Sequence, residues 1–505
     1  MTKERPIDLS CLLRICNCLY TVPIVRTTLK HSLRTLAILE DGFCCICRKM
    51  QVYCRKGGDE VSEKVKKPYR IATSVYVAVI FSFYLLFFGK NGLAAISKAK
   101  MHCYYALTIC YAATVIFLFI IQAVQKKLKI EQLKKDLHNT PAAAWLILSY
   151  LIFTVISACL SDFDTVWLGG NRHEGVLTIS LYCISFLLIC RFFRSERWML
   201  YLFAAAATAF GCICILQIFD INIFGLYPIV GDKKSCADYI SSFIGTIGNI
   251  DFTASFLCIA IPVFWCSILR FKEKMRFLLL IPLLLCLYIL LKIRVAAGYV
   301  GIFVGTLLSL PVVIPCTAKK RLLLLISVIS VFLAAGILIY CIDFQQRDLH
   351  DIHEVFHGNF KGRYGSGRIY IWKQTIRAIP DHLWFGNGPD TMSQMAFARL
   401  NFFNNNNELV YAKVFDAAHN EYLTTLFHQG IFALMAYLSA LTVSIVQWFC
   451  QAQTKPAAAI AGTAVLCYSL QAFFGISQLI TSPFFWCVFA ILVAVLQDKK
   501  EQHSS

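Results

Sequence analysis

Long runs of hydrophobic residues, separated by short polar or charged stretches, recur along the chain from about residue 71 onwards. A helix needs about 20 such residues to cross the hydrocarbon core of a bilayer. The pattern predicts an all-α, polytopic membrane protein with about twelve membrane-spanning helices. They lie near residues 71–88, 102–121, 142–160, 175–192, 198–217, 251–269, 276–292, 296–315, 321–341, 431–450, 457–474 and 482–497.

The stretches between these runs alternate in charge, which predicts the orientation of the chain because Lys and Arg are retained in cytoplasmic loops. Both termini are then cytoplasmic, and the loop at 90–100 is more basic than this scheme favours. The scheme divides the chain into a basic, Cys-containing segment at the cytoplasmic membrane surface, nine spans, a large extracytoplasmic loop with amphipathic helices, three spans and a cytoplasmic tail. These parts cover residues 1–70, 71–341, 342–430, 431–497 and 498–505.

Composition supports this class. Hydrophobic residues make up 58% of the chain, charged residues only 15%, and the mean hydropathy is +0.64, which excludes an ordinary soluble domain. The net charge of +19 is concentrated in the predicted cytoplasmic stretches. It therefore indicates membrane topology and attraction to anionic lipid headgroups rather than binding of nucleic acid.

The N-terminal segment contains four clustered cysteines, Cys44, Cys45, Cys47 and Cys54. They lack the paired C-x-x-C spacing of a zinc knuckle, so reduced or palmitoylated thiols are favoured over zinc. The preceding residues predict a basic amphipathic helix lying on the inner leaflet.

The loop at 342–430 is too long for a simple connection, and long loops on a rigid scaffold usually carry function. His353, Glu354 and His357 within it match the H-E-x-x-H zinc motif of metalloproteases. Asp162 and Asp164 have a spacing that can hold a divalent cation. An ordinary polar surface is the alternative at both places, and we expect no metal.

Residues 364–392 of this loop predict an amphipathic helix in the membrane interface, because Ile369, Trp372, Ile376 and Ile379 recur at helical spacing. Trp372 is its expected aromatic anchor, Ser366 its N-cap and Pro380 its end. Arg368 falls in the first turn, where a cation is unfavourable unless an anion such as phosphate is near. A guanidinium that reaches the lipid headgroups is the alternative.

The stretch "DAAHNEYLTTLFHQG" predicts a second helix, capped by Asp416 and broken at Gly430. His419 would lie in its first turn, where the helix dipole keeps the imidazole neutral and able to accept a proton. A hydrogen-bonded structural His is the alternative.

Taken in order, "WLGGNRHEGVLT", "GTIGNIDFTASFL", "SGRIYIWKQTIRAIPDHLWFGNGPDTM" and "AHNEYLTTLFHQGIFALMAYL" resemble the shared region of O-antigen ligases and polymerases, over roughly residues 160–440. The resemblance implies an inverting membrane glycosyltransferase that needs no metal or other cofactor. Its donor is a glycan on undecaprenyl diphosphate, and transfer to the hydroxyl of an acceptor glycan or lipid occurs at the extracytoplasmic face of the cell membrane.

The resemblance also assigns roles to residues. His419 matches the family's general base or acceptor-positioning His, and Arg368 matches the loop Arg that holds the carrier diphosphate. Arg294 is offset by two residues from the family's second Arg, so Lys292 is a candidate to share its role. Further candidate substrate-binding residues are Asn420, Trp372 and Arg172, the last of which alternatively pairs with Glu174.

The acceptor, and with it the choice between ligase and polymerase, stays open. A transporter or flippase of lipid-linked glycans is the first alternative function; it predicts charged residues in mid-membrane spans and two related halves, and the sequence displays neither. A metalloprotease built on "HEVFH" is the second.

Overall fold

The computed structural model describes residues 63–125, 134, 136–170, 172–227, 245–403 and 409–498. The chain divides into two units, Met1–Val61 and Ser62–Ser505, and every described residue lies in the second. The predictions for the N-terminal amphipathic helix and for the Cys44–Cys54 cluster lie outside the described residues.

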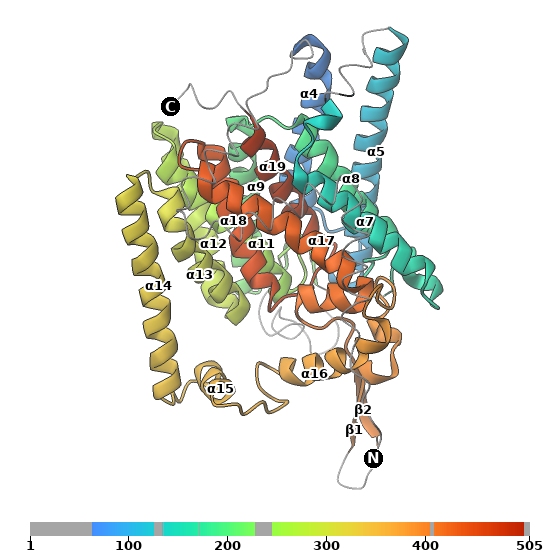
Figure 1. The fold of residues 1–505 in the computed structure, drawn as a ribbon, viewed down its shortest axis with the longest axis vertical. Coiled ribbons are helices and arrows are strands. Elements are labelled where there is room, and N and C mark those ends of the chain that lie inside the picture. The colour runs from blue at the N-terminus through green and yellow to red at the C-terminus, as the bar shows by residue number, and fades with distance from the viewer. Residues whose placement is uncertain are drawn as a thin grey trace, which may run out of the picture. The chain divides into compact units, whose positions relative to one another are not determined.

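The described part of the chain is built of helices, which confirms the all-α fold class (Figure 1). A hydrophobic run near every predicted span lies on a helix, and in the first span α4 continues into a π-helical turn, Ile80–Tyr84. An antiparallel hairpin of β1 (Arg399–Phe403) and β2 (Leu409–Val414) was not expected. The principal helices are α4 (Glu63–Val79), α5 (Ile96–Val124), α7 (Ala142–Cys159), α8 (Val176–Phe192), α9 (Arg197–Ile218), α11 (Ile250–Arg270), α12 (Leu280–Ile293), α13 (Ala296–Val313), α14 (Ala318–Cys341), α15 (Arg347–Phe356), α16 (Arg368–Ala378), α17 (Glu421–Gln451), α18 (Pro456–Ala472) and α19 (Ser482–Gln497).

Among the described residues, eight helices are long and apolar enough to cross a membrane, fewer than the twelve or so predicted. The difference lies in α8, α18 and α19, which are apolar but only 16 or 17 residues long, and in α4, which begins in the charged stretch "EKVKK". A 17-residue helix is at the short limit for crossing the hydrocarbon. The chain is a multi-pass membrane protein.

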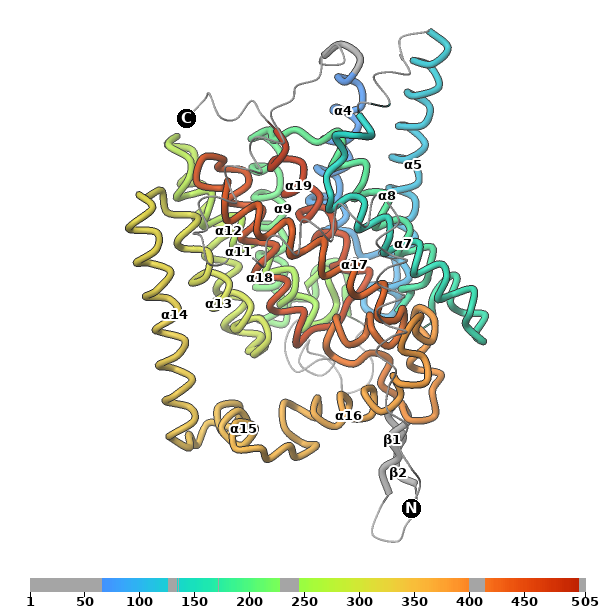
Figure 2. The backbone as a smooth tube through the Cα atoms, viewed as in Figure 1, coloured from blue at the N-terminus to red at the C-terminus, as the bar shows by residue number. Residues whose placement is uncertain are grey.

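Burial varies widely between these helices. In α11, 78% of the most apolar window is buried, whereas in α14 only 6% is buried. Figures 1 and 2 show α14 at the edge of the bundle, with α15 and α16 following its lower end. Because its side chains after Arg321 are almost entirely apolar, α14 is suited to contact lipid on most of its surface.

Among the described residues, Lys100 and Lys455 are buried, and each ammonium lies at the end of another helix. The Lys100 ammonium donates to the carbonyl oxygens of Tyr84 and Leu85, and the Lys455 ammonium donates to those of Val495 and Leu496. A cation at a helix C-terminus satisfies carbonyls that have no intrahelical partner. These lysines are therefore explained as helix caps.

The connections gather into two sets at opposite ends of the bundle. Arg270 donates to the carbonyls of Val313 and Gln453, which joins three loops at the upper end in Figure 1. At the lower end the layer of α15 and α16 meets the loops before α8 and α17. These two sets are those separated by the charge pattern of the sequence.

Candidate functional site

Arg368 is the first residue of α16, so its predicted place in a first helical turn is confirmed. The predicted N-cap is wrong: Gly367 occupies that position in a left-handed conformation, and no side chain caps the helix. Ser366 is also left-handed, with φ of 60°. The backbone N–H groups of Arg368, Ile369 and Tyr370 donate instead to the carbonyl oxygens of Gly365, Tyr364 and Gly362. The positive end of the helix dipole at this turn still favours an anion.

The Arg368 guanidinium makes few contacts for a largely buried group. One terminal nitrogen, Nη1, donates to the carbonyl of Gly365 over 3.2 Å, and Nε is buried with no hydrogen-bond partner among the described residues. Burial lowers the pKa of Arg368, whereas the negative charges of Asp251 and Asp348 raise it. A buried N–H without an acceptor is costly, and a phosphate oxygen would satisfy it.

Trp372, one turn further along α16, connects this helix to the residue before His419. Its indole Nε1 donates to the carbonyl oxygen of Ala418 over 2.9 Å, and its ring contacts those of Phe473 and Phe474. The predicted apolar stripe is interrupted, because Thr375 is buried whereas Ile376 is 56% exposed. Trp372 therefore fixes the position of α16 relative to the His419 turn.

The second helix begins later than predicted. Its N-cap is Asn420, whose side-chain oxygen accepts from the backbone N–H of Leu423 over 3.0 Å, and Asp416 is not a cap. His419 consequently precedes α17 instead of lying in its first turn, and it has a left-handed backbone with φ of 51°. The capping hydrogen bond accounts for the buried side chain of Asn420. His419, in the turn just before the cap, is half-buried.

Gly430 breaks the second helix as predicted. The turn at Gly386–Gly388 packs against the backbone at this break. Gly430 has φ of 81° and ψ of 178°, and α17 resumes after this kink. The backbone N–H of Asn387 donates to the carbonyl of Phe427, and that of Gly388 donates to the carbonyl of His428. Moving this turn would therefore break hydrogen bonds to the helix that follows His419.

Replacing Gly430 with Ala is expected to destabilise the protein. A Cβ at this position would lie 2.3 Å from the carbonyl oxygen of Trp384, and the positive φ is strained for any L side chain. Strain of this kind costs roughly 1–3 kcal/mol. Thermal unfolding in detergent should show a lower midpoint for Gly430→Ala, whereas Gly336→Ala, in an open position on α14, should not lower it. Equal midpoints for both variants would contradict this packing.

Arg172 pairs with Asp416 rather than with Glu174. Its Nη2 lies 2.5 Å from the Asp416 carboxylate, and its Nη1 donates to Gln478 over 3.4 Å. The buried Asp390 carboxylate accepts from the backbone N–H groups of Arg172 and Glu174. The loops that contain Arg172, Asp390 and Asp416 are far apart in the sequence, and these contacts join them next to the His419 turn.

Breaking this ion pair is expected to loosen the His419 turn. Both side chains are largely shielded, with 15% and 24% exposed, so coupled groups of this kind interact by roughly 0.5–3 kcal/mol. A double-mutant cycle of Arg172→Gln and Asp416→Asn, followed by thermal unfolding, should show that the double variant loses less than the sum of the two single variants. Asp381→Asn, at an exposed position, is the control. Additive losses would show that the pair contributes nothing.

Two glutamates buried behind these loops were not predicted as site residues. Tyr182 and Ser477 donate to the Glu174 carboxylate, and Tyr437 and Tyr468 donate to that of Glu421. Burial, with smaller contributions from the charges of Asp390 and Glu421, raises the pKa of Glu174 to about 8. No local pattern in the sequence indicates these partners.

Arg294 lies at the end of α12, in a left-handed conformation that ends the helix, and its side chain is exposed. Lys292 is also exposed, with its ammonium 5.5 Å from the centre of the Tyr288 ring. The next helix, α13, packs its Gly298 against Ala254 near the start of α11. Asp251, in that first turn of α11, is close enough to Arg368 for its negative charge to raise the pKa of the guanidinium. The α12–α13 turn therefore belongs to the same end of the bundle as Arg368.

The "HEVFH" motif has a structural explanation. His353 Nδ1 is 2.7 Å from the carbonyl oxygen of Ile339, and His357 Nδ1 is 2.9 Å from that of His353. The Glu354 carboxylate accepts from Tyr364 and Asn359. Among the described residues, no group of three or more His, Cys, Asp or Glu is placed to hold a metal ion, and Asp162 and Asp164 are both exposed. These contacts attach α15 to the end of α14.

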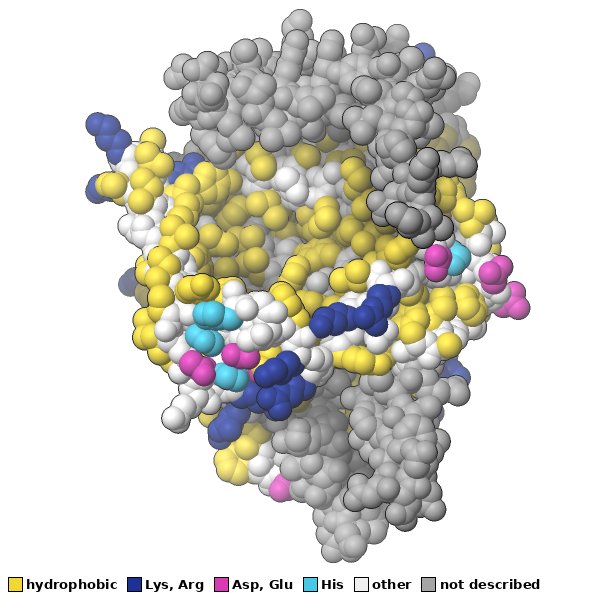
Figure 3. Space-filling model, turned by 60° about the horizontal axis from the view of Figure 1, so that its bottom comes forward, with side chains coloured by type: hydrophobic (Ala, Val, Ile, Leu, Met, Phe, Trp, Pro, Cys, Tyr) yellow, Lys and Arg dark blue, Asp and Glu magenta, His cyan; other side chains and the backbone are white. Residues whose placement is uncertain are grey.

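Figure 3 shows this end of the molecule, which is hollowed in its centre and has hydrophobic walls. Lys and Arg side chains gather beside the His and acidic side chains at its edge. The exposed basic residues of the α15–α16 layer are Arg347, Lys361, Arg363, Lys373 and Arg377. An apolar hollow with a cationic edge is suited to an anionic lipid.

Comparison with known proteins identifies the region that contains this site. Residues 252–438 match the family model described as O-antigen ligase, a stretch that includes Arg294, Arg368 and His419. This region belongs to the O-antigen ligase family. No curated protein shows significant similarity to the chain. The family is one of glycosyl-transferring membrane enzymes of polysaccharide biosynthesis, which favours this function over a transporter or a metalloprotease.

Proposed function

We propose that this O-antigen ligase homologue transfers a glycan from undecaprenyl diphosphate to an acceptor hydroxyl at the extracytoplasmic face of the cell membrane. The observation that carries the proposal is the state of Arg368, whose buried Nε lacks a partner among the described residues at the N-terminus of α16. A diphosphate supplies oxygens for this guanidinium, and the positive end of the α16 dipole favours its negative charge. The apolar hollow at this end of the molecule suits the polyprenyl chain (Figure 3).

The reaction is a single displacement. The acceptor oxygen attacks the anomeric carbon, the bond from that carbon to the diphosphate oxygen breaks, and the diphosphate leaves on its carrier. Arg368, with Arg294 at the same end of the bundle, stabilises the negative charge that develops on the departing phosphate. His419 accepts the proton of the acceptor hydroxyl or holds that hydroxyl in place. One displacement inverts the anomeric configuration.

The assay supplies a purified diphosphate-linked glycan and an acceptor glycan to the full chain and follows transfer. Because Arg and His provide the charge and the base in this mechanism, activity is expected to persist in EDTA. Product analysis should show the inverted anomeric configuration. Loss of activity in EDTA that returns on addition of a divalent cation would contradict the metal-independent mechanism, and retention of configuration would contradict the single displacement.

A further inference from the structure

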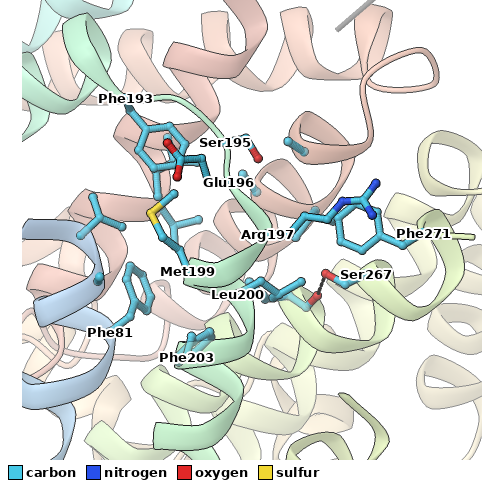
Figure 4. Close-up of a pocket in the computed structure, with 18 residues that line it drawn as sticks. Phe81, Phe193, Ser195, Glu196, Arg197, Met199, Leu200, Phe203, Ser267 and Phe271 are labelled. Atoms are coloured by element: carbon cyan, nitrogen blue, oxygen red, sulfur yellow. Dashed lines mark hydrogen bonds between the residues drawn. The ribbon is translucent and has the colours of Figure 1, made fainter. Parts of the chain in front are cut away.

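A cavity lies at the end of the bundle opposite to Arg368. It has a volume of about 130 Å³ and is enclosed by α4, α9, α11, α18 and α19 (Figure 4). Figure 4 shows Phe81, Met199, Leu200 and Phe203 grouped at its wall, with Arg197 and Phe271 side by side at its edge.

The interior of this cavity is apolar. Phe81, Met199, Phe203 and Val263 line it and are each less than 10% exposed, and the polar wall residue Ser267 already donates to the carbonyl of Val263. An apolar cavity of about 150 Å³ accommodates a ligand of the size of benzene. The cavity is therefore large enough for a segment of a hydrocarbon chain and offers that chain no polar partner.

The rim differs from the interior, because Ser195, Glu196 and Arg197 line it and are exposed. The indole of Trp198, which is 45% exposed, donates to the Glu196 carboxylate over 2.5 Å, so the Glu196 carboxylate is held by Trp198. Tryptophan is enriched at the level of the lipid headgroups. The rim is thus placed where a phospholipid changes from hydrocarbon to headgroup.

The charge of the rim favours an anion. The Arg197 guanidinium lies 5.1 Å from the centre of the Phe271 ring and pairs with Glu273, but both members of that pair are about half exposed. Exposed pairs of this kind contribute little, so a phosphate competes for the guanidinium at small cost. Lys272 and Lys274 are exposed on the adjacent loop, and the charge pattern of the sequence assigns this end to the cytoplasm.

We propose that this cavity binds one acyl chain of an anionic phospholipid from the cytoplasmic leaflet. The chain enters between α4, α9 and α11, and the phosphate contacts Arg197 and the Ser195 hydroxyl. The assignment is independent of the glycosyl transfer proposed at the other end. Bound lipid stabilises the folded chain by mass action because the unfolded chain lacks the cavity.

Photo-crosslinking tests this site directly. The full chain is placed in nanodiscs that contain phosphatidylglycerol with a diazirine in its acyl chain, or phosphatidylcholine with the same chains at the same mole fraction. Peptide mapping should find crosslinks at Met199, Leu200 and Phe203, with about fivefold more from phosphatidylglycerol, the preference expected for about one cationic contact. Arg197→Gln should reduce phosphatidylglycerol labelling to the phosphatidylcholine level.

A filled cavity provides the complementary measurement. Met199→Trp places a large ring in the cavity and should reduce crosslinks at Phe203 by about tenfold. Leu202→Trp, on the same helix at a position 38% exposed, should leave them unchanged. Should Met199→Trp fail to fold, Met199→Phe serves instead.

Three results would overturn the proposal. The first is the absence of crosslinks at these wall residues while the bilayer-exposed face is labelled. The second is equal labelling by the two lipids, which would show that the site does not recognise an anionic headgroup. The third is a crosslink from residues 1–61 to the cavity wall that excludes lipid, which would make the chain itself the occupant.

Discussion

Arg368→Ala is expected to reduce glycan transfer by about 100- to 1,000-fold, the usual cost of removing one group that stabilises charge in a transition state. The reason is that the guanidinium of Arg368, whose buried Nε has no partner among the described residues, lies at a helix N-terminus, where the dipole also favours an anion. Arg368→Lys keeps the charge but loses the fork of donors that fits phosphate oxygens, so it should recover only part of the activity. Initial rates with the purified diphosphate-linked donor provide the measurement.

The matched control is Arg377→Ala. Arg377 lies in the last turn of the same helix and is exposed, so its removal changes the net charge equally without affecting the site. Near-parental transfer is expected. If both variants lost activity to the same degree, the loss would be explained by general electrostatic attraction of the donor, and a specific contact between Arg368 and the diphosphate would be contradicted.

His419→Asn is expected to reduce transfer by about 100- to 10,000-fold, the range for loss of a general base. Asn is the informative substitution because His419 has φ of 51°, and Asn adopts that left-handed conformation more readily than Ala does. The turn and the Asn420 cap should therefore persist while the imidazole is lost. His419→Ala removes the imidazole and strains the turn as well, so it should also lower the midpoint of thermal unfolding.

His382→Ala is the control for removal of an imidazole, because His382 is exposed in the same loop between α14 and α17. It should retain parental transfer. A pH profile separates the two roles considered for His419: loss of the acidic limb of the profile in His419→Asn indicates a base, whereas an unchanged profile with a raised KM for the acceptor indicates positioning. An unchanged rate in His419→Asn would exclude both.

The parts of the fold that were predictable from the sequence are those set by local patterns. A hydrophobic run near every predicted span lies on a helix, because apolar composition and length determine a membrane helix largely on their own. Arg368 at a helix start and the break at Gly430 were predictable for the same reason, since a glycine and a first turn are local features. The count of spans was less predictable, because α8, α18 and α19 are of marginal length.

The errors at the site come from long-range contacts and from competition between neighbouring caps. Asp416 is a good N-cap in isolation, but its pairing with Arg172 commits it elsewhere, and Asn420 caps the helix four residues later. The contact from Trp372 to the Ala418 carbonyl joins residues 46 positions apart, which no local pattern encodes. The carboxylates of Asp390, Glu174 and Glu421 likewise acquire their partners only when the loops come together.

The most direct test of the central claim is the binding of a polyprenyl diphosphate and of the corresponding monophosphate to the parent and to Arg368→Ala, in nanodiscs of fixed lipid composition. The parent should bind the diphosphate more tightly than the monophosphate, and Arg368→Ala should bind the two alike. Unchanged preference for the diphosphate in Arg368→Ala would contradict the assignment of Arg368 to the carrier diphosphate.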